Sequence, residues 1–178
     1  MIVNNYRTRI TLALLWLLAI YGFLPFAPDI FKTICRVIKY EIFGNILIFF
    51  CIVLSLLIFI PYIKKFKNKK TAPYFIITAA LLTGCTINFS IRPISRMLHI
   101  PEYAVFGVLL FFAIIKKFSL KTSYVLTVAL GILAGIIDER VIQFLLPMRY
   151  YDIKDIYLNS TGILIGVCLI FAYNMRKS

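Results

Sequence analysis

Six long stretches of the sequence contain almost no charged residues, and this feature limits the possible folds more than any other. They lie near 10–27, 43–63, 73–90, 98–115, 122–137 and 157–174. A helix needs about 20 apolar residues to cross a bilayer core roughly 30 Å thick. The sequence therefore predicts an all-α fold, a polytopic transmembrane bundle of about six spans that forms a single domain over residues 1–178.

The overall composition excludes several other classes of protein. Hydrophobic residues make up 62% of the chain and charged residues 15%, whereas soluble domains are about half apolar and about a quarter charged. Because the excess lies in continuous blocks, a disordered tail, a disulfide scaffold and a nucleic-acid-binding module are all excluded. The first block follows two arginines, as a signal peptide would, but no small-residue cleavage site follows it, so we expect a retained span.

The net charge of +13 reflects where the basic residues lie. The N-terminus, the 64–70 and 116–121 loops and the C-terminus carry lysine and arginine but no acidic residue, while all seven acidic residues lie in or beside the alternate segments. Basic residues concentrate in cytoplasmic loops. We therefore expect a multi-pass protein of the bacterial cytoplasmic membrane with both termini inside. The lysine-rich 64–70 loop then touches anionic lipid, and no nucleic-acid partner is expected.

The segment after the first block has the pattern of an amphipathic helix. Apolar residues recur at helical spacing over 29–42, and Lys32, Arg36 and Lys39 fall on the opposite side. Such a helix lies flat on the outer membrane surface. It either gates access from the lipid or surrounds the bundle as a collar, and the collar is the favoured interpretation.

Neither a cofactor nor a metal site is predicted. Three of the four cysteines lie in apolar blocks, and no CxxC or Cys/His spacing occurs. Membrane-buried thiols are the simpler interpretation. The sequence leaves open whether Asp152 and Asp155 hold Ca²⁺ or Mg²⁺ through oxygen ligands.

Polar residues gather at one end of the predicted spans four, five and six. On span four, His99, Glu102, Tyr103 and Phe106 share one face at helical spacing. Ionisable groups at or in spans are costly and persist mainly where they pair or line a cavity. We therefore expect an outward-facing polar pocket between these spans.

The other members of this group follow spans five and six. At the end of span five, Glu139 and Gln143 lie one turn apart, and Asp138 points off that line. Helix capping or ion pairing is the favoured interpretation of Glu139, Arg140 and Lys154 when they are considered alone. At the start of span six, one stripe of the helix carries Asp152, Asp155, Asn159, Gly162 and Gly166, and Arg149 precedes it.

Two pairs of glycines at four-residue spacing indicate close helix packing. Gly131 and Gly135 lie on span five, and Gly162 and Gly166 lie on span six. Small residues at this spacing let transmembrane helices approach closely. This is a packing signal and indicates no function by itself.

The same polar residues resemble the signature of the VanZ-like family of bacterial membrane proteins. The matching run comprises Asp138, Glu139, Gln143, Pro147, Arg149, Asp152, Asp155, Asn159, Gly162 and Gly166, and His99-(x2)-Glu102-Tyr103-Ala104-(x2)-Gly107 is similar to the motif of that family's fourth span. The resemblance covers roughly residues 90–170. It implies a cell-envelope protein, since the founding member gives resistance to teicoplanin, a lipid-bearing glycopeptide antibiotic. It also adds Glu139 to the functional set.

Three functions remain open from the sequence. The first is a binding protein for a lipid headgroup, a lipid-linked envelope precursor or a glycopeptide antibiotic, contacted by Tyr103, Gln143, Arg149, Asp152, Asp155 and Asn159. The second is an enzyme acting on a lipid headgroup, with His99, Glu102, Asp138 and Glu139 as catalytic residues. The third is a proton-coupled transporter or flippase, least favoured because the span centres carry no charge.

Overall fold

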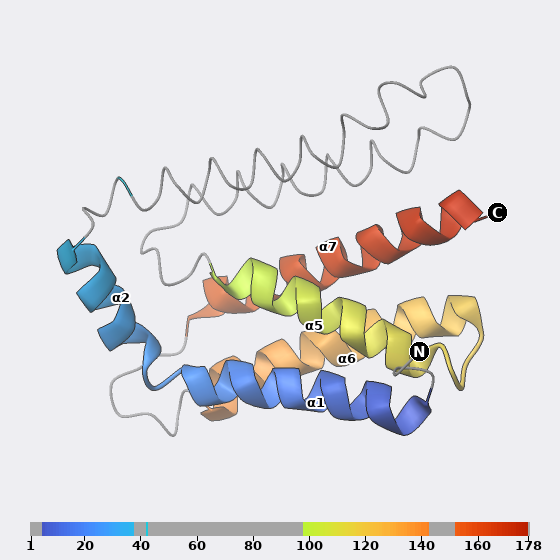
Figure 1. The fold of residues 1–178 in the computed structure, drawn as a ribbon, viewed down its shortest axis with the longest axis horizontal. Helices are drawn as coiled ribbons and strands as arrows, with labels where there is room; N and C mark the ends of the chain where they lie inside the picture. The colour runs from blue at the N-terminus through green and yellow to red at the C-terminus, as the bar shows by residue number, and fades with distance from the viewer. Residues whose placement is uncertain (1–4, 38–41, 43–97, 143–151, 178) are drawn as a thin grey trace, which may run out of the picture.

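The described part of the chain consists mainly of helices. The computed structural model describes residues 5–37, 42, 98–142 and 152–177, and no strand occurs in these ranges. The helices are α1 (Tyr6–Phe23), α2 (Ala27–Val37), α5 (His99–Ile114), α6 (Leu120–Ile137) and α7 (Ile153–Lys177), and α6 continues into a π-helical turn, Asp138–Ile142 (Figure 1). The predicted all-α class is therefore confirmed for this part of the chain.

The predicted spans correspond to these helices only in part. Spans four, five and six match α5, α6 and α7 to within a few residues at most ends. The first predicted block, 10–27, is displaced, because α1 begins at Tyr6 and ends at Phe23, just before a turn that contains Pro25. The second and third predicted spans, 43–63 and 73–90, lie outside the described residues.

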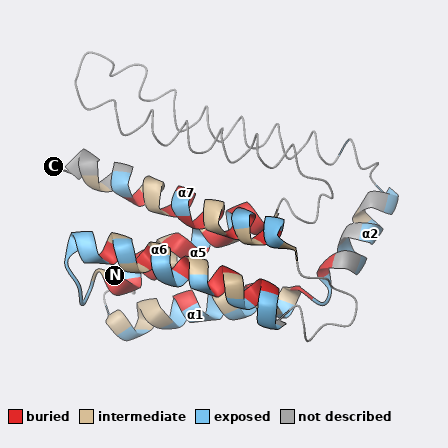
Figure 2. Cartoon of the chain, turned by 180° about the vertical axis from the view of Figure 1, so that it is seen from behind, coloured by how far each residue is buried: buried red, intermediate tan, exposed pale blue. Residues whose placement is uncertain are grey.

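The bundle is antiparallel, so alternate helix ends gather on the same side. Helices α1 and α6 run in one direction and α5 and α7 in the other (Figure 1). Figure 2 shows the buried residues concentrated on α5, α6 and α7, whereas α1 buries only Ala13 and Ile20. The starts of α5 and α7 therefore meet the end of α6, which is where the sequence predicts a polar pocket.

Local sequence signals set the ends of two helices. The Asn5 side chain accepts a hydrogen bond from the Arg7 backbone N–H at the start of α1. The Ser119 hydroxyl accepts one from the Thr122 backbone N–H at the start of α6. Both satisfy backbone donors that the first turn of a helix leaves without an intrahelical partner.

Two helices in the described ranges have the length and composition to cross a membrane. They are Leu120–Val141 and Ile153–Phe171, and His99–Ile114 is apolar but shorter. Large apolar side chains are exposed on the outside of the bundle, among them Leu18 at 63% and Val125 at 62%. Exposed apolar patches of this kind mark interaction surfaces such as those that face lipid.

Glycines allow α7 to lie directly against α5 and α6. A Cβ atom at Gly162 would lie 2.5 Å from the Ile100 carbonyl oxygen, and one at Gly166 would collide with the Ala104 carbonyl oxygen. On α6, a Cβ at Gly131 would lie 2.5 Å from the Ile163 side chain. The predicted close approach at both glycine pairs is therefore confirmed.

Helix α2 leaves the bundle at the end where the acidic residues gather. It turns away from the direction of α1 after the 24–26 turn (Figure 1). Its exposed side chains include Ile30 and Val37. The predicted amphipathic helix over 29–42 is thus present over its described part, Ala27–Val37, while residues 38–41 lie outside the described residues. Its position on a membrane surface stays a prediction.

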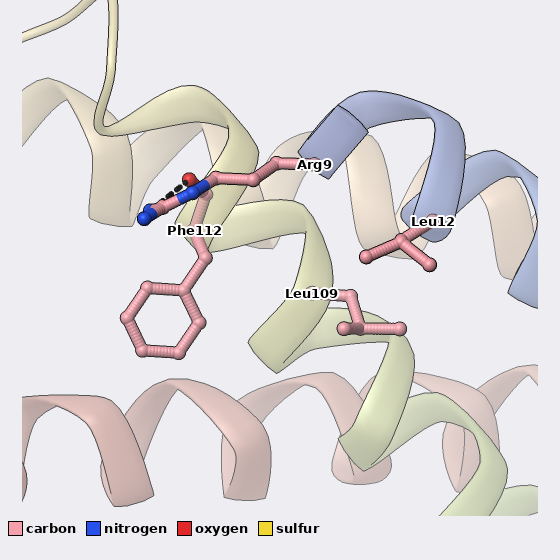
Figure 3. Close-up of a pocket in the computed structure, with 4 residues that line it drawn as sticks. All are labelled: Arg9, Leu12, Leu109 and Phe112. Carbon is pink, nitrogen blue, oxygen red and sulfur yellow. Dashed lines mark hydrogen bonds between the residues drawn. The ribbon is translucent and has the colours of Figure 1, made fainter. Parts of the chain in front are cut away.

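The opposite end of the bundle is basic. Arg9 of α1 donates a hydrogen bond of 3.1 Å to the Phe112 carbonyl oxygen near the end of α5 (Figure 3). The same guanidinium lies 5.9 Å from the Phe112 ring centroid, and the Lys117 amine lies 4.3 Å from the Tyr6 ring centroid. The free carbonyls at a helix C-terminus favour cations, so these contacts hold the start of α1 against the end of α5.

Candidate functional site

A histidine and two carboxylates form the centre of the polar cluster. His99 begins α5, and Asp138 and Glu139 form the start of the π-helical turn after α6. One nitrogen or oxygen atom of each side chain lies within 4.8 Å of the others. Asp138 is 0% exposed and Glu139 is 1% exposed. We call these three residues the His99 group.

The first turns of α7 add two more buried polar side chains. The Asp155 Oδ2 atom lies 3.9 Å from the His99 Nε2 atom. Asn159 lies one turn further along α7 and is 0% exposed. A Cβ atom at Gly135 would lie 2.9 Å from the Asn159 Cβ atom, and Gly135 precedes Asp138 and Glu139 by one turn. Asn159 therefore packs against α6 one turn before the two carboxylates.

Hydrogen bonds from two tyrosines connect three helices to this cluster. The Tyr103 hydroxyl on α5 donates a buried bond of 2.9 Å to Asp138 Oδ2. The Tyr21 hydroxyl on α1 donates a bond of 2.8 Å to the Ala134 carbonyl oxygen. That same carbonyl accepts from the Asp138 backbone N–H. Asp138 is thereby fixed in place by side chains and backbone together.

Glu102 lies beside a separate apolar pocket between α1 and α5. This pocket has a volume of about 310 Å³ and is lined by Trp16, Ala19, Ile20, Phe23, Leu98 and Glu102. The Trp16 indole N–H donates a bond of 2.9 Å to the Glu102 carbonyl oxygen. Glu102 is partly exposed and does not belong to the His99 group. The predicted common face of α5 therefore divides, with His99 and Tyr103 buried and Glu102 at this pocket.

Asp152 has a structural position at the start of α7. Its Oδ1 atom accepts a hydrogen bond of 2.9 Å from the Lys154 backbone N–H. This is the geometry of an N-cap. Lys154 and Arg140 have exposed side chains. Two predicted site residues, Gln143 and Arg149, lie outside the described residues.

The arrangement places three carboxylic acids next to one imidazole in a largely water-excluded position. Burying several like charges is costly. Buried carboxylates of this kind share protons or bind cations. An imidazole beside them is suited to accepting and donating protons near neutral pH. The cluster can therefore transfer a proton, recognise an amine or hydroxyl group, or hold a cation.

Helix α1 also contributes to the site, which the sequence pattern did not predict. Tyr21 and Trp16 bond to the backbone of the helices that carry the cluster, although the pocket was predicted between spans four, five and six only. The available signal was modest. Tyr21 and Trp16 are residues with polar tips in an otherwise apolar helix, and Tyr21 lies near the end that the acidic residues share.

Comparison with known protein families finds a match to VanZ/LLP1 over residues 86–174, half of the 178-residue chain. The matched range contains α5, α6 and most of α7, together with the His99 group, Asp155 and Asn159. No curated protein and no solved structure matches the chain. Because the matched range covers half of the chain, we conclude that this chain belongs to the VanZ/LLP1 family.

Proposed function

We propose that this chain is a cell-envelope membrane protein that binds a lipid headgroup or a lipophilic glycopeptide and contributes to teicoplanin-type resistance. The observation that carries the proposal is the buried cluster of His99, Asp138, Glu139, Asp155 and Asn159 at one end of an apolar bundle. Family membership supports the same conclusion.

The chemistry of the cluster favours a ligand rich in amine or hydroxyl groups. Carboxylates accept hydrogen bonds, and their bonds to charged donors are the strong ones. Asp138, Glu139 and Asp155 all come from helix ends that meet on one side of the bundle. A sugar or an amine headgroup fits such acceptors better than an isolated phosphate does.

The neighbouring apolar pocket favours a ligand that also carries a lipid chain. Among the described residues that line it, all but Glu102 are apolar, and it opens between α1 and α5 at the same end as the His99 group. A volume of about 310 Å³ is at the lower end of the range for small-molecule pockets. It accommodates a section of an acyl chain while the headgroup reaches the carboxylates.

The proposal includes a topology. The chain crosses the bacterial cytoplasmic membrane about six times with both termini in the cytoplasm, since the end that carries Arg9 and Lys117 is basic. The acidic end then faces outward. Glycopeptides and lipid-linked precursors are accessible from that side of the membrane.

Antibiotic susceptibility tests the proposal directly. Expression of the wild type in a susceptible bacterium is expected to raise the inhibitory concentration of teicoplanin and to leave that of a glycopeptide without a lipid chain unchanged. Asp138→Asn should abolish the increase because it weakens a central acceptor. Asp29→Asn makes the same chemical change on α2, outside the His99 group, and should retain it. Equal susceptibility of the wild type and an empty vector, at confirmed expression, would refute the proposal.

A second candidate is an enzyme that modifies a lipid headgroup. The observation that favours it is the placement of His99 beside Asp138, Glu139 and Asp155, a suitable arrangement for general acid–base catalysis. Mass spectrometry of membrane lipids from cells with the wild type or an Asp138→Asn/Glu139→Gln double variant separates the two functions. A headgroup change that requires these carboxylates supports catalysis, and unchanged lipids support binding.

A further inference from the structure

We infer that the His99 group binds a divalent transition-metal ion. His99 comes from α5, whereas Asp138 and Glu139 come from the turn after α6, so the three donors converge from different helices. Their ligand atoms lie within 4.8 Å of one another. Ligand atoms lie about 2.0–2.2 Å from Zn²⁺, so two of them on one ion are at most about 4.4 Å apart. Small side-chain rotations therefore bring all three onto one ion.

The donor set indicates the class of metal. One imidazole nitrogen and two carboxylate oxygens are typical ligands for zinc and related transition metals. Mg²⁺ and Ca²⁺ prefer all-oxygen sites. Three protein ligands also match catalytic rather than structural zinc sites, which leave one position for water or substrate.

Asn159 supplies an independent indication that a ligand belongs here. Neither its Oδ1 nor its Nδ2 atom has a hydrogen-bond partner among the described residues, although the side chain is 0% exposed. Buried amides in native proteins are nearly always hydrogen-bonded. Asn159 packs against Gly135, one helical turn before Asp138 and Glu139, so its carbonyl is placed to bind the ion or a water on it.

The surrounding contacts are those that orient metal ligands. Metal-binding histidines commonly donate their second ring N–H to a carboxylate, and ligating carboxylates accept hydrogen bonds. The Tyr103 hydroxyl donates such a bond to Asp138 Oδ2 at 2.9 Å. Asp155 Oδ2 lies 3.9 Å from His99 Nε2, an ion-pair distance that is longer than a hydrogen bond. A bound divalent cation also offsets the repulsion among the buried carboxylates.

Metal titration of the purified protein tests the inference. The full-length chain, with an affinity tag that contains no histidine, is treated with a chelator in detergent and titrated with Zn²⁺. The wild type is expected to bind one equivalent. His99→Ala, Asp138→Asn and Glu139→Gln should each weaken binding by more than roughly 100-fold, because loss of a residue that only orients a ligand already costs roughly 10–100-fold. Asp29→Asn is the matched control and should bind as the wild type does.

Two further measurements keep the test decisive if a variant fails to fold. X-ray absorption of the Zn²⁺-loaded wild type should show nitrogen and oxygen donors with one imidazole, and sulfur donors would overturn the inference because they implicate the cysteines. Ca²⁺ should not displace Zn²⁺. No binding by the folded wild type, or unchanged binding in all three folded variants, would also overturn it.

The ion site does not depend on the proposed function. Zn²⁺ binding with no effect on teicoplanin susceptibility would leave the ion site standing and refute the resistance proposal. Resistance in a protein that binds no metal would support the resistance proposal and refute the ion site.

Discussion

At the scale of single residues, the polar cluster depends on hydrogen bonds that hold charged groups in an apolar bundle. The Asp138 carboxylate is buried and accepts from Tyr103, and its backbone N–H bonds to the carbonyl that Tyr21 also contacts. The adjacent Glu139 is buried as well. Both lie in a π-helical turn, a local widening of the helix that is frequent at functional sites.

Removal of the Tyr103 hydroxyl should destabilise the protein measurably. Tyr103→Phe keeps the ring and deletes the donor to the Asp138 carboxylate. The variant loses an interhelical hydrogen bond and leaves a buried carboxylate without this donor. We therefore expect the free energy of unfolding to fall by about 1–2 kcal/mol. Chemical unfolding in detergent measures this loss. Tyr157→Phe is the control, because Tyr157 is 67% exposed, and equal stability of the two variants would contradict the prediction.

At the scale of elements, the site exists because α5 and α7 lie in direct contact. Gly162 and Gly166 place the α7 backbone against the Ile100 and Ala104 carbonyls. The contact brings the first turns of both helices together, so that Asp155 comes within 3.9 Å of His99. The site geometry therefore depends on the packing of α5 against α7.

Added volume at this contact should separate the two helices. A methyl group at Gly166 would meet the Ala104 backbone, which cannot rotate away. Overpacking of this kind typically costs about 1–3 kcal/mol, so Gly166→Ala should lower the thermal unfolding temperature. Gly22→Ala has nothing within 4 Å of the new carbon and should be neutral or slightly stabilising. The prediction fails if both alanine variants unfold at the wild-type temperature.

At the scale of the whole molecule, charge is separated along the bundle. Arg9 and Lys117 contact aromatic rings at one end, and the carboxylates of the His99 group lie at the other. From this separation, the positive-inside rule predicts that the basic end faces the cytoplasm.

Reporter fusions should reveal that orientation. Alkaline phosphatase is active only outside the cytoplasm, so fusion after residue 142 should give an active enzyme. Fusions after residues 118 and 178 should be inactive, while green fluorescent protein at residue 178 should fluoresce. The opposite activity pattern would place the acidic end in the cytoplasm and would remove the basis for an outward-facing ligand site.

The sequence by itself determined the class of fold and most of the site's members. Long apolar blocks predict helices because a bilayer leaves backbone groups no other partners. Polar residues that recur near the ends of these blocks identified His99, Asp138, Asp155 and Asn159, and the glycine pairs predicted close packing. These signals are local and periodic, so they can be seen along the chain.

The tertiary structure decided what no local pattern contains. His99 converges with Asp138 and Glu139 because the start of α5 lies beside the end of α6. These residues are 39 or more positions apart in the sequence, so only the packing of the two helices brings them together. The same packing accounts for three further features. Glu139 lies in a π-helical turn, Tyr21 of α1 bonds to the α6 backbone, and Glu102 lies at a separate pocket. Helical spacing fixes which residues share a face of one helix, but only the assembled bundle fixes which faces of different helices meet.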